Sequence, residues 1–149
     1  MRCVVQRVSH AAVKVNDKVV GKIRTGLLAL IGIGSEDSKQ DIEWLAEKII
    51  GLRIFEDNEG KMNLSLVDVK GELLLVSQFT LFGDCRKGKR PSFSDAAPPG
   101  IAKTLFDELV NTIRLKGIIV ETGEFQTNME VELINQGPVT ILLDSKKNF

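Results

Sequence analysis

The segment that decides the fold reads GLLALIGI, residues 26–33, and contains no charged or polar side chain. A continuous apolar run of this length is typical of a strand that is buried on both faces, at the centre of a sheet. The turn-forming segment 34–38 follows and offers several helix N-caps. From Gln40 to Leu52 the apolar residues recur at helical spacing, so a helix is predicted directly after the central strand.

The segments on either side predict further strands and one more helix. The β-branched stretch from Val4 to Val15 and the pair Val19-Val20 flank Asn16-Asp17, which indicates a hairpin. Three of the four prolines lie in residues 83–100, which are therefore expected to form a loop. A helix is predicted at 101–115 with Gly117 as its C-cap, and strands are predicted at 53–55, 73–82, 118–120, 131–134 and 139–143.

The order of these elements favours one fold class. Strands dominate and do not alternate regularly with helices, which disfavours a doubly wound parallel sheet. Residues 1–149 contain no repeat or linker, and their number is near the commonest domain size. We predict a single α+β domain with a strongly curved, mainly antiparallel sheet or barrel and two helices packed outside it.

Composition limits the partners and the compartment. No apolar run approaches the roughly 20 residues of a membrane span, and no signal-peptide pattern is present. Two distant cysteines, Cys3 and Cys85, make no disulfide framework, so we expect a cytoplasmic protein without a membrane partner. The 20 basic and 20 acidic residues balance. A neutral chain has no global field for duplex DNA, so any nucleic acid is expected to be held at a local patch or through a small chemical group.

The loop 83–90 has the spacing of a phosphate-binding P-loop but not its context. Arg90 stands where a magnesium-binding Ser or Thr is required, and Pro91 follows instead of a helix. Its cations, Arg86, Lys87, Lys89 and Arg90, leave two alternatives open: a solvated surface loop, or a clamp for the phosphates of a nucleic acid end.

The usual catalytic sets are missing. His10 is the only histidine and lies far in sequence from any candidate nucleophile, so a Ser-His-Asp triad is not favoured. One histidine and two distant cysteines do not have the spacing of zinc ligands. No metal and no cofactor are predicted.

Two stretches are unusual. Ser77, Gln78 and Thr80 interrupt a predicted buried strand, and buried hydroxyls and amides need partners. They indicate either a wet strand end or a site built from uncharged donors and acceptors. Gly137-Pro138 stands between two predicted strands and is compatible with an ordinary turn, since only about 5–6% of such bonds are cis in folded proteins.

Taken together, these stretches carry a family resemblance. The chain resembles the D-aminoacyl-tRNA deacylases, which include D-tyrosyl-tRNA deacylase, from Met1 to Asp144. The matching motifs are Gly60-Lys61-Met62-Asn63, Ser77-Gln78-Phe79-Thr80, Arg90-Pro91-Ser92-Phe93 and Gly137-Pro138-Val139-Thr140. Two departures are Gln136, where an acidic residue is commoner, and Gln126, where a small residue often stands.

The resemblance implies a homodimer with its active site at the subunit interface. Residues Ser77 to Thr80 of one subunit would form the floor, and a cis Gly137-Pro138 of the other would reach across it. Phe125 and Met129 match positions that line the pocket, and Arg7 matches a position near the cross-subunit loop.

The implied reaction is hydrolysis of the ester that joins a D-amino acid to the 3′ end of tRNA. The ribose 2′-hydroxyl would assist, and backbone N–H groups near Phe79 and Thr80 could stabilise the oxyanion. L-amino acids would be rejected by collision with the Gly-Pro backbone, and glycine would not be excluded. Three alternatives stay open: Thr80 as nucleophile, a non-enzymatic RNA-end binding module, and a structural dimer.

Overall fold

The apolar segment forms strand β3 (Gly26–Gly32), which lies between two partner strands in the computed structural model of residues 1–149. Strand β1 (Arg2–Val15) pairs with it antiparallel, and β6 (Glu72–Ser77) pairs with it parallel. All but one residue of β3 are buried. The predicted central strand is therefore confirmed, with its two buried faces.

The other strands extend this centre on both sides. The order is β2-β1-β3-β6-β7, with β2 at Lys18–Ile23 and β7 at Val120–Thr122. Strand β8 (Glu130–Asp144) pairs antiparallel along nearly the whole of β1. Every pairing of β1 is antiparallel, whereas β3, β6 and β7 run parallel. The sheet is thus mixed, and antiparallel pairs predominate.

The sheet curls until β2 approaches β7. A Cβ atom at Gly21 would overlap the Thr122 carbonyl oxygen, so this glycine allows the two strands to come close. The curl encloses a small apolar cluster on one face of the sheet, and its buried members are Val8, Ala11, Val13, Ile23, Leu28, Leu74 and Val76. The alternate residues of β3 point the other way, as strand geometry requires.

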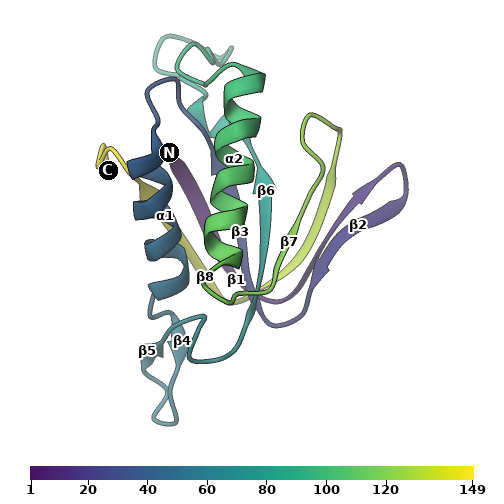
Figure 1. Ribbon diagram of the computed structural model, residues 1–149, viewed down its shortest axis with the longest axis vertical. Helices are drawn as coiled ribbons and strands as arrows, with labels where there is room; N and C mark the ends of the chain where they lie inside the picture. The colour runs from purple at the N-terminus through teal and green to yellow at the C-terminus, as the bar shows by residue number, and fades with distance from the viewer.

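Both helices cover that other face. Helices α1 (Lys39–Gly51) and α2 (Pro99–Arg114) lie side by side in front of the sheet (Figure 1). Their stripes, which include Leu45 and Leu109, pack on Leu27 and Ile31 in the main core. The predicted α+β domain, with a curved sheet and two outer helices, is confirmed. Neither helix combines the length and the apolar character that a membrane-spanning helix needs.

One predicted strand is shorter than expected. The pattern at 73–82 suggested continuous strand, but β6 ends at Ser77 and residues Phe79–Phe82 form the short 3₁₀ helix η1. The physical reason is the partner: the last β3 residue paired with β6 is Ile31, opposite Ser77. Beyond it, Leu81 and Phe82 fold over Gly32, where a Cβ atom would lie 3.0 Å from Leu81 Cβ.

Two predicted strands are in fact one. The sequence separated 131–134 from 139–143 by a possible turn, but β8 runs through both. Both halves pair antiparallel with β1, so the chain between them does not reverse. The register shifts around Arg7, and residues 136–139 bulge out of the ladder there.

The remaining differences concern boundaries. Asn16 and Asp17 form the predicted hairpin with positive φ angles of 48° and 63°, as the twist of a tight hairpin favours. The predicted strand at 53–55 is β4 (Phe55–Glu56), paired with β5 (Met62–Leu64). The strand predicted at 118–120 is displaced to β7, and the helices differ by one or two residues at their ends.

We predict that Gly26→Ala destabilises the fold at its centre. An added Cβ would overlap backbone atoms of Glu72, where β3 and β6 begin to pair, and backbone cannot move aside as a flexible side chain can. The free energy of unfolding should fall by about 2 kcal/mol or more in urea denaturation. Gly51→Ala is the matched control because no atom lies within 4 Å of its Cβ. Equal stability of the two variants would contradict the prediction.

Candidate active site

The Ser77–Thr80 segment lies at the carboxyl end of a parallel strand. The Gln78 N–H donates to the Ile31 carbonyl oxygen at 2.7 Å, which holds the chain to β3 just after the last ladder pair. The chain then turns into η1. In sheets with parallel strands, ligands commonly bind beyond these carboxyl ends.

Exposed backbone donors begin this turn. Phe79 and Thr80 are the first residues of η1, and neither N–H has a hydrogen-bond acceptor within the chain. Helix geometry explains this, because the first N–H groups of a helix have no carbonyl acceptor within the helix. Gln78 Nε2 donates to Thr80 Oγ1, so both polar side chains are fixed beside the donors.

Aromatic side chains pack beside the same turn. Phe79 is 59% exposed, and its ring lies edge-on to that of Phe93, with 5.1 Å between ring centroids. The close packing depends on Gly83, where a Cβ atom would lie 3.0 Å from both the Phe93 ring and the Thr80 carbonyl oxygen. The packed rings of Phe79 and Phe93 therefore border the turn on one side.

The segment that carries Phe125 and Met129 leaves β7 beside this turn. Gly123 N–H donates to the Leu75 carbonyl oxygen at 3.1 Å, two residues before Ser77. Phe125 is half-buried against Phe106 of α2, with ring centroids 6.3 Å apart. Met129 folds back on Gly123, whose missing Cβ makes room for the sulfur atom. The segment thus begins beside β6, and its two predicted site residues diverge: Phe125 packs against the helix-covered core and Met129 against the cluster on the other face of the sheet.

The Gly137-Pro138 segment lies apart from the Ser77–Thr80 turn and is held by Arg7. Its buried guanidinium donates through Nε to the Gln136 carbonyl oxygen at 3.1 Å and through Nη1 to the Ile54 carbonyl oxygen at 2.7 Å. Its Nη2 lies 3.9 Å from the Glu56 carboxylate. A Cβ atom at Gly137 would lie 2.9 Å from Arg7 Nη2, so only glycine fits without a shift.

Gly137 and Pro138 themselves project from the strand. Both are exposed, Gly137 has a φ angle of +127°, and the peptide bond between them is cis. Gln136 offers only its backbone oxygen to Arg7, and its side chain is exposed. The unusual glutamine at this position therefore leaves the Arg7 contact intact. Gln126, the other departure, is exposed at a φ angle of +58°.

The Ser77–Thr80 turn and the Gly137-Pro138 segment are far apart within one chain. Strands β8, β1, β3 and β6 are successive neighbours, so three spacings of about 4.8 Å separate Gly137-Pro138 from the Ser77 segment across the sheet. Along the strands, Arg7 pairs with Leu27 and Leu27 with Leu73, which precedes Ser77 by about 13 Å. One chain does not bring all the predicted site residues together.

Apart from the exposed Cys85 thiol, which follows this turn in the chain, the conventional catalytic side chains lie elsewhere. His10 is half-exposed on β1, and its Nε2 lies 3.7 Å from the Glu132 carboxylate. Burial raises the pKa of the Cys3 thiol well above its ordinary range, so it stays protonated in the core. No three His, Cys, Asp or Glu side chains cluster to hold a metal ion.

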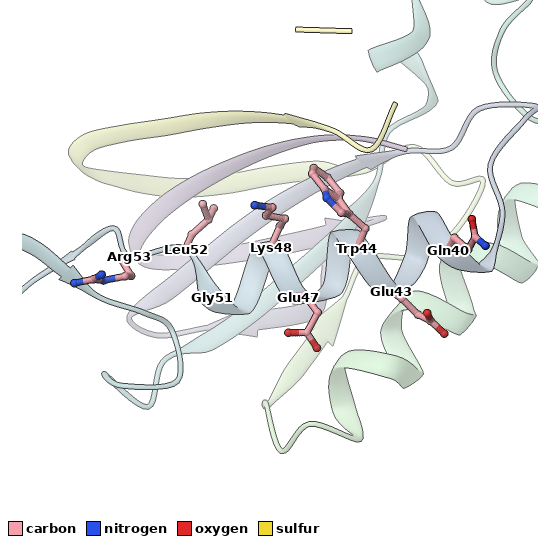
Figure 2. A pocket seen from close by; sticks show the side chains of 8 residues that line it. All are labelled: Gln40, Glu43, Trp44, Glu47, Lys48, Gly51, Leu52 and Arg53. Atoms are coloured by element: carbon pink, nitrogen blue, oxygen red, sulfur yellow. The ribbon is translucent and has the colours of Figure 1, made fainter. Parts of the chain in front are cut away.

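A hollow on the surface lies elsewhere. It has a volume of about 640 Å³ and lies along the outer side of α1, beside Trp44, Lys48 and Arg53 (Figure 2). None of the predicted site residues lines it. A second hollow of about 520 Å³, between α2 and β7, includes only Phe125 of them. These two hollows therefore do not locate the predicted site.

Sequence reasoning assigned no site role to three contributors, although it quoted Phe93 in a family motif. Phe93 packs on the turn, and the Ile54 carbonyl and Glu56 hold Arg7 from β4. A backbone carbonyl leaves no signal in residue identity, so Ile54 has none to find. Glu56 resembles any other exposed acidic residue in the sequence.

Comparison with known proteins decides the family. The family model described as D-Tyr-tRNA(Tyr) deacylase matches residues 4–144. A D-aminoacyl-tRNA deacylase of Thermosipho africanus is 63% identical, and one of Thermotoga petrophila is 60% identical; each alignment covers all of both chains. The chain belongs to this family. The predicted resemblance is thereby confirmed over the full length.

Solved structures agree with the deacylase fold. That of a protein named "c-Myc DNA Unwinding Element Binding Protein" superimposes with a TM-score of 0.92 at 38% identity, covering 97% of this chain and 98% of that one. Another, of a probable eukaryotic D-amino acid tRNA deacylase, has a TM-score of 0.81 at 20% identity and covers 95% and 97%. At that identity the second supports the fold alone.

We predict that Arg7→Lys loosens the Gly137-Pro138 segment. An ammonium group keeps the charge but lacks the planar fork that reaches both carbonyl oxygens, so the free energy of unfolding should fall by about 1–3 kcal/mol. Hydrogen exchange should accelerate at the Val139 N–H, which donates to Asn135 Oδ1 at 3.1 Å.

The control for this variant is Arg24→Lys, because Arg24 pairs with Glu72 on the surface with its side chain 88% exposed. Its effect should stay below about 1 kcal/mol. Unchanged exchange at Val139 in Arg7→Lys would refute the positioning role of Arg7.

Proposed function

We propose that the protein hydrolyses the ester between a D-amino acid and the 3′ end of a tRNA, releasing both. The observation that carries this is the pair of free N–H donors at Phe79 and Thr80, presented on a fixed turn in a chain of the deacylase family. An aminoacyl ester is already activated toward water. Placement and electrostatic stabilisation are then the contributions that the protein has to make.

The Ser77–Thr80 segment would act on the ester carbonyl. As water attacks, negative charge develops on the carbonyl oxygen, and the N–H groups of Phe79 and Thr80 would donate to it. Loss of one such donor costs about 3–4 kcal/mol of barrier in other enzymes. The neighbouring ribose 2′-hydroxyl would assist the attack, because the one histidine of the chain, His10, lies on β1 beside Glu132.

A second copy of the chain would complete the site. Gly137 and Pro138 are exposed and lie far from Ser77 in their own chain, so they would reach the turn of a partner instead. Strand β8 offers a surface for such pairing because it lies at a sheet edge and exposes Ile134 and Leu142, 53% and 60% respectively. We propose a homodimer with two equivalent sites.

Chiral selection would follow from the same contact. The backbone of Gly137-Pro138 would occupy the space that an L side chain needs, whereas a D side chain would point away from it. Phe125 and Met129 would line the remaining pocket, and Arg7 would fix the Gly-Pro segment. A site that only excludes L side chains is permissive, so it would also accept glycyl-tRNA and varied D-amino acids.

A second candidate is a nucleic-acid-binding module without hydrolysis. Two observations favour it: the cationic loop 86–90, and the 38% identity to a protein that is named for binding a DNA unwinding element. This candidate predicts tight, salt-dependent binding of uncharged RNA and no ester cleavage. Both candidates would work in the cytoplasm, where tRNA is charged.

A chirality-resolved deacylation assay tests the proposed activity. The protein should hydrolyse D-aminoacyl-tRNA and glycyl-tRNA and leave the L-aminoacyl counterpart nearly untouched, with at least ~100-fold between the enantiomers, about 2.7 kcal/mol. Scintillation counting of released amino acid measures each rate. Equal hydrolysis of both enantiomers, or hydrolysis of neither, would contradict the proposal.

Thr80→Ala tests the backbone mechanism. If only the Thr80 N–H acts, the variant should keep deacylation within about tenfold of wild type, a barrier change of roughly 1.4 kcal/mol. Thr80→Ser is the control that keeps the hydroxyl. An inactive Thr80→Ala beside an active Thr80→Ser, together with an acyl adduct on the wild type in mass spectrometry, would make Thr80 the nucleophile.

A further inference from the structure

A structured cationic loop stands directly beside the candidate active site. We name residues 84–92 the basic loop; its base is closed by Asp84 and Ser92, which exchange backbone hydrogen bonds of 2.8 and 3.0 Å. It contains Arg86, Lys87, Lys89 and Arg90, all exposed. Figure 1 shows it at the top of the molecule, in the connection between β6 and α2.

One of the four cations is neutralised within the loop. Arg86 Nη2 lies 2.7 Å from Asp84 Oδ2, and hydrogen bonds from the Arg86 guanidinium and N–H lower the pKa of that carboxyl to about 2. Asp84 is therefore ionised at neutral pH and balances Arg86.

The other three cations have no partner. Lys87, Lys89 and Arg90 make no hydrogen bond or ion pair with the rest of the chain. The whole chain is neutral, so three unpaired positive charges within four residues form a local excess. Such a concentration attracts polyanions at short range without a global field.

The loop is fixed to the turn that carries the donors. Phe93, the residue after the loop, packs edge-on to Phe79, and Gly83, the residue before it, lies in close contact with Phe93 and Thr80. An ester carbonyl held at the N–H groups of Phe79 and Thr80 would therefore have a fixed position relative to the three cations. The nucleotides next to a 3′-terminal ribose carry the phosphates that would extend toward them.

We propose that Lys87, Lys89 and Arg90 of the basic loop bind backbone phosphates of the single-stranded 3′ end of the RNA substrate. This inference rests on the proposed function, because the ester fixes which end of the RNA enters. Phosphate contacts position a nucleic acid without reading its sequence. The loop would thus let one site act on many tRNAs and would favour an ester on RNA over the same ester on a lone nucleoside.

The test compares two triple variants on two substrates. The loop variant is Lys87→Gln, Lys89→Gln, Arg90→Gln; the control is Lys18→Gln, Lys22→Gln, Lys39→Gln, which removes three other exposed cations without ion-pair partners. The substrates are a D-aminoacyl-tRNA and the 3′-ester of the same D-amino acid with adenosine, which has no phosphate. The kcat/KM of each is measured at 50 and 200 mM salt.

The loop variant should lose salt dependence on tRNA. Each phosphate contact to a single strand contributes about 0.7 to the slope of log affinity against log salt, so three contribute about 2.1. Between 50 and 200 mM salt, the fall in kcat/KM on tRNA should be about 20-fold smaller than for wild type. The ratio of kcat/KM on tRNA to that on the adenosine ester should drop at 50 mM salt, while the control keeps the wild-type ratio and slope.

Each other outcome overturns the proposal. A loop variant with the wild-type slope, or with equal losses on both substrates, excludes phosphate binding by the loop while leaving the proposed function intact. An equal change in the control variant would show a general charge effect. If the wild type cleaves neither ester, the proposed function fails, and the inference fails with it.

Discussion

Strand β3 is buried on both faces along nearly its whole length, and this constraint arranges the rest of the molecule. Its apolar side chains alternate between the helix-covered core and the cluster inside the curved sheet. Burial on both sides requires that its backbone groups pair with strands on both edges, because an unpaired buried N–H or C=O costs as much as a lost hydrogen bond. Strands β1 and β6 supply those partners. Where this pairing ends, at Ile31 and Ser77, the chain is free to turn and to expose donors.

The same pairing explains why the candidate site is divided. The ladder fixes Ser77 at the carboxyl end of β6. It holds Arg7 of β1 level with Leu73, about four residues before that end, and β8 pairs with the other edge of β1. A rigid sheet cannot fold these parts onto one another. Arg7 instead makes its hydrogen bonds within its own chain, to Gln136 and Ile54, so that the Gly137-Pro138 segment stands out from the strand. A projecting, pre-positioned segment of this kind suits contact with another molecule.

The chemistry and the surface charge are consistent with each other. Backbone N–H groups have fixed directions and no pKa in the physiological range, which makes them suitable for an ester that water can already attack. In the proposed function, specificity comes from shape at Gly137-Pro138 and from charge in the basic loop. The hydrogen bond of Gln78 and the packing of Phe79 on Phe93 connect the donor turn and the basic loop to the sheet, and Arg7 connects the Gly137-Pro138 segment.

The sequence by itself determined the elements and the family. Apolar periodicity is a local property, so the central strand, both helices and the hairpin at Asn16-Asp17 were predictable. The motifs Ser77–Thr80 and Gly137–Thr140 were sufficient to indicate the family, which the comparisons confirmed. Only the tertiary structure decided that β6 stops at Ser77 and that β8 runs through Pro138, because the extent of a strand depends on its partner's backbone. It also decided which carbonyl oxygens Arg7 reaches, since backbone oxygens are the same at every residue and only folding places them.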